Sequence, residues 1–294
     1  MKSRPVSAVA VLVSVFLFCA PPALSGQTGC EIPFRSNGHL IVVEASLGNK
    51  YGLRFLIDTA ATGIVADNDL IKALGMKRLA GNSQIVTLGQ ISKADRFHLP
   101  KLQIGPVYTM LQLHCSGADL SGLGVDGIIG ADLLGQQTWL ANCKTNQVIE
   151  SGSFTIDFES RTLRFGVQQQ LKDTVPLKVR NHQIVVVAMI QGHPLRLAVD
   201  TGVHTIFLYK ESQMGWLESM MTHQSAWFFM AGGTSAGKRV LLPDIELGNS
   251  RWRDLDGILM DLPNQSKDGL LSVWQLGLKI VHFDFKRNLM SWKK

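Results

Sequence analysis

The chain has 294 residues, of which 46% are hydrophobic and 18% are charged. That length suffices for two lobes of about 120 to 140 residues, each with its own core. The formal net charge is +6, but no Lys/Arg cluster and no interleaving of basic with aromatic residues accompanies it, which excludes a nucleic-acid-binding protein of the basic-patch kind.

Residues 1–25 have the pattern of a secretory signal peptide. A short basic start precedes an uncharged apolar run from Val6 to Ala20, and a Pro-Pro break and small residues around Ser25 follow. The apolar run is short for a membrane span. We therefore expect an exported protein, periplasmic or secreted after cleavage, with no other contact with the membrane. An uncleaved membrane anchor is the alternative.

Four cysteines are present, and Cys19 lies in the predicted signal peptide. Export allows one disulfide among Cys30, Cys115 and Cys143, with one thiol left over. Cys115 with Cys143 is the favoured pair because both lie in the same half of the chain, although the sequence does not fix the connectivity. There is no CxxC and no histidine spacing typical of a metal site, so we predict no metal and no cofactor.

One stretch occurs twice. Residues 53–64 read Leu-Arg-Phe-Leu-Ile-Asp-Thr-Ala-Ala-Thr-Gly-Ile, and residues 195–206 read Leu-Arg-Leu-Ala-Val-Asp-Thr-Gly-Val-His-Thr-Ile. Each is an apolar strand that ends in an Asp-Thr pair, and Asp200 follows Asp58 by 142 positions. A single Asp at a strand end usually caps a turn. Two at matching positions indicate a pair of carboxylates where two lobes meet.

The strands before and after this stretch are also duplicated. Hairpins over residues 40–57 and 184–199 lead to the two Asp residues. Further hairpins follow over residues 84–105, with a turn at Gly89, and over residues 227–248, with a turn at Gly232 and Gly233.

The later part of each half repeats a second element and a closing hairpin. Residues 126–134 and 268–276 begin with Asp-Gly and two apolar residues, which predicts a very short buried strand and then a short helix. Alternating hairpins close the halves at residues 154–165 and 281–292. Residues 166–176 form the expected linker, and the other helix candidates span residues 67–74 and 211–221.

The fold class is therefore all-β, with a few short helices. We expect an N-terminal lobe over residues 26–170 and a C-terminal lobe over residues 171–294.

The order and doubling of these two elements resembles the aspartic protease superfamily. The chain is most similar to a bacterial retropepsin-like or pepsin-like protein with both lobes in one chain, over nearly all of the mature sequence. The residues that carry the resemblance are Asp58-Thr59-Ala60-Ala61, Asp200-Thr201-Gly202-Val203, Asp126-Gly127-Ile128-Ile129-Gly130 and Asp268-Gly269-Leu270-Leu271.

The resemblance implies a bilobed acid-protease fold with β-barrel-like lobes and a cleft between them. Asp58 and Asp200 would lie side by side on the cleft floor as the catalytic pair. Thr59 and Thr201 would hydrogen-bond across the lobes, with Ala60 and Gly202 beside them. Such close carboxylates share one proton, so one serves as the base towards water and the other as the acid towards the peptide carbonyl.

The resemblance also implies how the substrate is held. Hairpins at Gly89 and at Gly232 and Gly233 would fold as flaps over a peptide or protein in an extended conformation. No homodimer is needed, because both aspartates belong to one chain. The expected activity is that of an exported, monomeric aspartic endopeptidase.

Four positions depart from the family pattern. Ala60 replaces a glycine, Val203 and His204 stand where small residues are usual, and Ser272 stands where the first half has Gly130. A charged His204 close to Asp200 would lower the pKa of that aspartate. These departures leave open a weak or inactive relative that binds peptides or proteins, and a scaffold for assembly on the cell surface.

Overall fold

The structure is a computed structural model that describes residues 30–87, 90–110, 112–134, 139–142, 148–150, 152–209, 215–230, 233–261 and 267–294. The predicted signal peptide, Gly89, Cys143 and Gly232 lie outside these ranges. No helix in the described part of the chain is long and apolar enough to cross a membrane.

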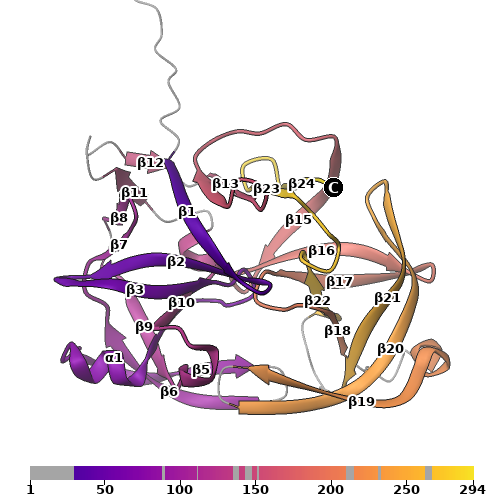
Figure 1. The fold of residues 1–294 in the computed structure, drawn as a ribbon, viewed down its shortest axis with the longest axis horizontal. Coiled ribbons are helices and arrows are strands. Elements are labelled where there is room, and N and C mark those ends of the chain that lie inside the picture. The colour runs from indigo at the N-terminus through magenta and orange to yellow at the C-terminus, as the bar shows by residue number, and fades with distance from the viewer. Residues whose placement is uncertain are drawn as a thin grey trace, which may run out of the picture.

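Two β-rich lobes lie side by side and share a sheet at the top of the view in Figure 1. We call this the linking sheet. Its strands, all antiparallel, are in spatial order β1(Cys30–Asn37), β14(Thr162–Phe165), β13(Ser153–Asp157), β23(Ile280–Asp284), β24(Leu289–Lys293) and β15(Asp173–Arg180). The closing hairpins of the two halves thus meet along β13 and β23, which shows that they form one joint sheet.

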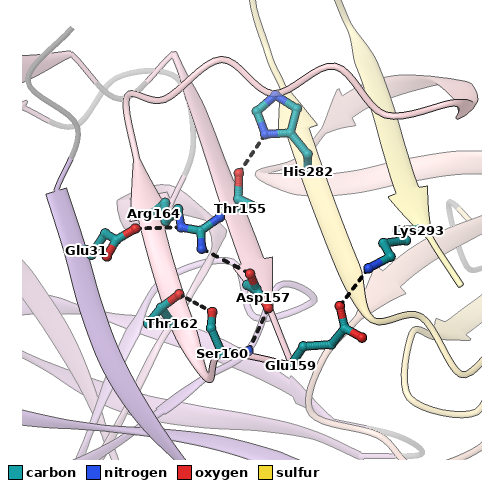
Figure 2. Close-up of polar contacts among 9 residues, drawn as sticks. All are labelled: Glu31, Thr155, Asp157, Glu159, Ser160, Thr162, Arg164, His282 and Lys293. Carbon is teal, nitrogen blue, oxygen red and sulfur yellow. Dashed lines mark hydrogen bonds and ion pairs between the residues drawn. The ribbon is translucent and has the colours of Figure 1, made fainter. Parts of the chain in front are cut away.

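Apolar and polar contacts both hold the linking sheet together. Phe154 pairs with Phe283 at its centre, and their stacked ring centroids are 4.6 Å apart. Figure 2 shows the polar contacts, in which Arg164 donates to both Glu31 and Asp157.

The first lobe is built from the N-terminal half. After Pro33, β1 leaves the linking sheet, and Phe34–Asn37 pairs with β2. The remaining strands are β2(Leu40–Leu47), β3(Lys50–Ile57), β4(Ile64–Asp67), β5(Arg78–Thr87), β6(Gln90–His98), β7(Leu102–Ile104), β8(Val107–Thr109), β9(His114–Ala118), β10(Gly127–Ile129), β11(Trp139–Asn142) and β12(Val148–Glu150).

The second lobe repeats this plan. β15 leaves the linking sheet after Pro176, and Leu177–Arg180 pairs with β16. Because β15 begins at Asp173, the linker is shorter than the expected residues 166–176. The remaining strands are β16(Gln183–Ile190), β17(His193–Asp200), β18(Ile206–Tyr209), β19(Met221–Met230), β20(Gly233–Leu247), β21(Ser250–Met260) and β22(Gly269–Ser272).

The short Asp-Gly strands are buried, as their apolar sequence predicts. Every residue of β10 and of β22 is buried. β10 pairs in parallel with β3 and antiparallel with β4, and β22 pairs in the same way with β17 and β18. These central strands therefore fix where β3 and β17 end, and hence where Asp58 and Asp200 lie.

Helices are few and short: α1(Asn68–Ala73), α2(Ala131–Leu134), and the 3-10 helices η1(Ser121–Leu123) and η2(Gly215–Met220). Asp67 caps α1 by accepting from the backbone N–H of Asp69. The helix expected after residue 271 is not formed. Gln275 there binds the backbone of Ile206 and Asp256 through its side chain, and residues 273–277 form turns instead.

Cys115 does not form the disulfide that the sequence favoured. It lies on β9 between β4 and β6, where its side chain is part of the apolar core and its thiol is free. Burial raises the pKa of this thiol to about 12. The side chain is directed to the interior of its own lobe, which is the reason for the difference.

Candidate active site

Asp58 and Asp200 come from matching strand ends in the two lobes. Asp58 follows β3, and its backbone N–H donates to the carbonyl of Ile129 at 3.0 Å. Asp200 ends β17 in register with Ser272 of β22. Two N–H groups at the start of the following turn, those of Ala60 and Ala61, donate to Oδ1 of Asp58, at 2.9 and 3.1 Å.

The two carboxyl groups meet at the interface between the lobes. The two side chains lie close enough together for each to shift the pKa of the other. The N–H of Gly202 donates to Oδ1 of Asp200 at 2.7 Å. A Cβ placed on Gly202 would lie 3.2 Å from both carboxyl groups, so the chain passes close to the pair.

The surroundings of this pair favour a shared proton. Burial raises the pKa of Asp58. The pKa of Asp200 is raised more strongly, because burial and the negative charge of Asp58 both act to raise it. Attraction to Lys267 opposes both increases. Burial and the charge of Asp200 also raise the pKa of Tyr209, which keeps that phenol neutral.

Two threonines lock the carboxylate loops together through four reciprocal hydrogen bonds. Thr59 Oγ1 donates to the carbonyl of Val199 at 2.7 Å, and Thr201 Oγ1 donates to the carbonyl of Ile57 at 2.8 Å. Each hydroxyl also accepts from the backbone N–H of the other threonine, at 3.1 and 3.2 Å. Both side chains are buried, so the two loops are held in fixed register.

The first hairpin of each lobe also contacts the other lobe. His39 Nε2 donates to the carbonyl of Gly202 at 3.2 Å. Gln183 Nε2 donates to the carbonyl of Ala60 at 2.7 Å. Ala60 and Gly202 occupy matching positions beside the two aspartates. These two contacts are therefore a second pair of reciprocal hydrogen bonds between the lobes.

Lys267 is the cation whose charge acts on the pKa values of both carboxyl groups. No motif in the sequence predicted this role. Lys267 Nζ donates to Oε1 of Gln183 at 2.9 Å. Burial lowers the pKa of Lys267, whereas Asp200 and Asp58 act to raise it. The available signal was its place directly before Asp268, where the first half has Val125.

Ala60 fits its turn without strain. Neither Ala60 nor Gly202 has a positive φ, so this position does not require glycine for its backbone conformation. The methyl group of Ala60 packs against an apolar cluster of the second lobe that contains Val185 and Phe207. The carboxylate loop keeps its hydrogen bonds despite the substitution.

Ser272 is also accommodated. In the first lobe a Cβ at Gly130 would lie 2.6 Å from the carbonyl of Ala61, which leaves no room for a side chain. In the second lobe Ser272 Oγ instead donates to the carbonyl of Val203 at 2.8 Å. The serine therefore replaces a close backbone contact with a buried hydrogen bond.

His204 does not act on the aspartates. It is exposed, its ring centroid lies 5.3 Å from that of His39, and it is not among the groups that shift the pKa of Asp200. The charge that lowers the pKa of the aspartates comes from Lys267.

Two long hairpins flank the interface, β5–β6 in the first lobe and β19–β20 in the second. β19 runs along the bottom of the view in Figure 1 towards β6, and it contacts η1 of the first lobe. Gly233 begins β20, whereas the tip residues Gly89 and Gly232 lie outside the described residues. Among the described residues no group of three or more His, Cys, Asp or Glu could hold a metal ion.

Comparison with known proteins identifies the family. The family model described as aspartyl protease matches residues 43–133 and 186–273, more than half of the chain, and each match contains one Asp-Thr element and one Asp-Gly element. The crystal structure of aspartic proteinase from Irpex lacteus is similar over 90% of this chain and 97% of its own, with a TM-score of 0.57 and 12% identity, which shows a common bilobed fold. No curated protein matches the chain. The chain belongs to the aspartyl protease family.

Proposed function

We propose that this chain is an exported aspartic endopeptidase that hydrolyses peptide bonds with a water molecule activated between Asp58 and Asp200. The observation that carries the proposal is the close approach of the two carboxyl groups, one from each lobe, which both lie 3.2 Å from the position of a Cβ on Gly202. Burial raises the pKa values of both groups. Such a pair holds one proton between two groups, which is the state that acid–base hydrolysis requires.

The backbone contacts support a division of roles. Asp58 accepts two backbone N–H groups at one oxygen, whereas Asp200 accepts one. Hydrogen bonds to a carboxylate favour its ionised form, so Asp58 ionises first and Asp200 keeps the shared proton. Asp58 then takes a proton from water as the water oxygen attacks the peptide carbonyl carbon, and Asp200 donates its proton to the carbonyl oxygen, which gives a gem-diol. The C–N bond of the gem-diol then breaks: Asp58 gives its proton to the leaving nitrogen, and Asp200 takes one back from a hydroxyl group as the new carboxyl group forms. No covalent intermediate with the protein forms.

The substrate in this proposal is a peptide or protein in an extended conformation, held between the lobes beneath the β5–β6 and β19–β20 hairpins. A single chain supplies both carboxylates, so a monomer is sufficient. Export to the periplasm or the medium rests on the signal-peptide pattern of residues 1–25, which would leave two lobes over residues 26–170 and 171–294.

Cleavage profiling by mass spectrometry tests the proposal. The purified mature protein is incubated with a diverse peptide library from acid to neutral pH, beside Asp58→Asn and Asp200→Asn. The expected result is cleavage by the wild type that either substitution abolishes. Silence from well-folded wild type, with activity gained by Ala60→Gly, would instead identify an inactive relative that binds peptides.

A further inference from the structure

The two lobes differ in chemistry at one pair of matching positions beside the carboxylates. In the first lobe Leu40 begins β2 and Val125 precedes Asp126, and both side chains belong to an apolar cluster around Leu56 and Ile128. In the second lobe the matching positions are the start of β16 and the residue before Asp268, and they carry Gln183 and Lys267. An apolar pair is thus replaced by an amide and an ammonium group.

Hydrogen bonds fix the direction of this ammonium group. Lys267 Nζ donates to Gln183 Oε1 at 2.9 Å, and Gln183 Nε2 donates to the carbonyl of Ala60 at 2.7 Å. The N–H of Ala60 in turn donates to Oδ1 of Asp58 at 2.9 Å. A chain of three contacts therefore connects the half-buried Lys267 to the carboxylate loop of the opposite lobe.

The charge of Lys267 is not neutralised by a salt bridge within the described part of the chain. The negative charges that act on it are those of Asp58 and Asp200. An ammonium group has three N–H donors, and the contact with Gln183 uses one of them. The remaining donors can bind a group that enters the space between the lobes.

We propose that Lys267 forms a cationic subsite that selects substrates with an acidic side chain, Asp or Glu, on one side of the scissile bond. This inference rests on the proposed function of the Asp58 and Asp200 pair. A pair that shares one proton carries one negative charge, which repels an acidic side chain nearby. Lys267 offsets that repulsion and donates a charge-assisted hydrogen bond to the substrate carboxylate.

Matched peptides test the subsite. Two sets of peptides carry either Glu or the isosteric Gln next to the scissile bond, one set on each side, and kcat/KM is measured at pH 6, where free glutamate is ionised. We expect the wild type to cleave the Glu peptide about ten-fold better than the Gln peptide on one side only. In Lys267→Met the ratio should fall to one or below.

Three further variants separate the subsite from other effects. Lys267→Arg retains the charge and should retain a preference for Glu. Lys72→Met removes an exposed lysine on α1, and its ratio should match that of the wild type. Gln183→Leu leaves Lys267 in place but removes the amide that directs it, so an intermediate ratio is expected even if Lys267→Met folds poorly. If Lys267 acts only on the aspartates, Lys267→Met changes kcat/KM equally for the Glu and Gln peptides. The ratio of the two kcat/KM values then stays as in the wild type, which would overturn the proposal.

A binding measurement distinguishes failure of the subsite from failure of catalysis. The same peptide pairs, with a hydroxyethylene group in place of the scissile amide, are titrated into the wild type and Lys267→Met by calorimetry. Tighter binding of the Glu peptide that Lys267→Met removes supports the subsite even if no peptide is cleaved. Equal binding of the two peptides overturns the subsite while leaving the hydrolase proposal standing. No binding of either peptide overturns both.

Discussion

Thr201→Val tests whether the crossed threonines hold the two lobes together. The hydroxyl of Thr201 donates to the carbonyl of Ile57 at 2.8 Å and accepts from the N–H of Thr59 at 3.1 Å, and both threonine side chains are buried. Valine has nearly the same shape but no hydroxyl, so the substitution leaves one buried acceptor and one buried donor without a partner. Each such group costs about 1 to 3 kcal/mol, which predicts a loss of about 2 to 6 kcal/mol in the free energy of unfolding.

Urea unfolding monitored by tryptophan fluorescence measures this loss. Thr201→Ser is the matched control, because serine keeps both hydrogen bonds and loses only a methyl group, at a cost of about 1 kcal/mol. Thr59→Val should behave like Thr201→Val, since it removes the other two of the four bonds. If Thr201→Val is as stable as Thr201→Ser, the four hydrogen bonds do not hold the lobes, and the reasoning fails.

Further predictions concern the core and its ionisable groups. A Cβ on Gly269 would lie 2.1 Å from the carbonyl oxygen of Phe207, so Gly269→Ala should destabilise the protein by about 1 to 3 kcal/mol in urea unfolding, whereas Gly122→Ala, which meets no atom within 4 Å, should change stability by less than about 0.5 kcal/mol. His282 is buried with one ring nitrogen unpartnered, and burial lowers its pKa, so below pH about 6.5 the unfolded chain binds more protons than the folded chain. The free energy of unfolding should therefore fall as the pH drops from about 6.5, by up to about 1.4 kcal/mol per pH unit from this residue, and an unchanged slope in His282→Gln would contradict the assignment. With a pKa of about 12, Cys115 should resist iodoacetamide at pH 8 in the folded protein and react after unfolding, as peptide mapping by mass spectrometry would show.

The pattern of the sequence predicts the parts of the fold that repeat. Strands that end in Asp-Thr and short apolar strands after Asp-Gly occur at matching places in both halves, and the structure has them as β3, β10, β17 and β22. The burial of β10 follows from its composition, because a strand without polar residues needs cover on both faces. Local composition and duplication were sufficient for these elements.

Contacts between the lobes could not be predicted in this way. Gln183 and Ala60 are 123 positions apart, and no periodic pattern or motif links them. His39 reaches Gly202 over 163 positions for the same reason. Such contacts depend on how one folded lobe packs on the other, and sequence periodicity reports only the face that each strand turns to its own core.

A comparison of the halves with each other separates support from selectivity. Arg54 and Arg196, at matching places, each donate a backbone N–H at 2.7 Å to the Asp of the Asp-Gly element, Asp126 and Asp268. The same residue types and the same hydrogen bond occur in both lobes because the strand before each proposed catalytic Asp has the same geometry. Lys267, the residue directly before Asp268, differs from its counterpart Val125. Two identical lobes would bind the two sides of a substrate in the same way. A directional substrate calls for different chemistry in the two halves, and in the proposed subsite Lys267 supplies that difference.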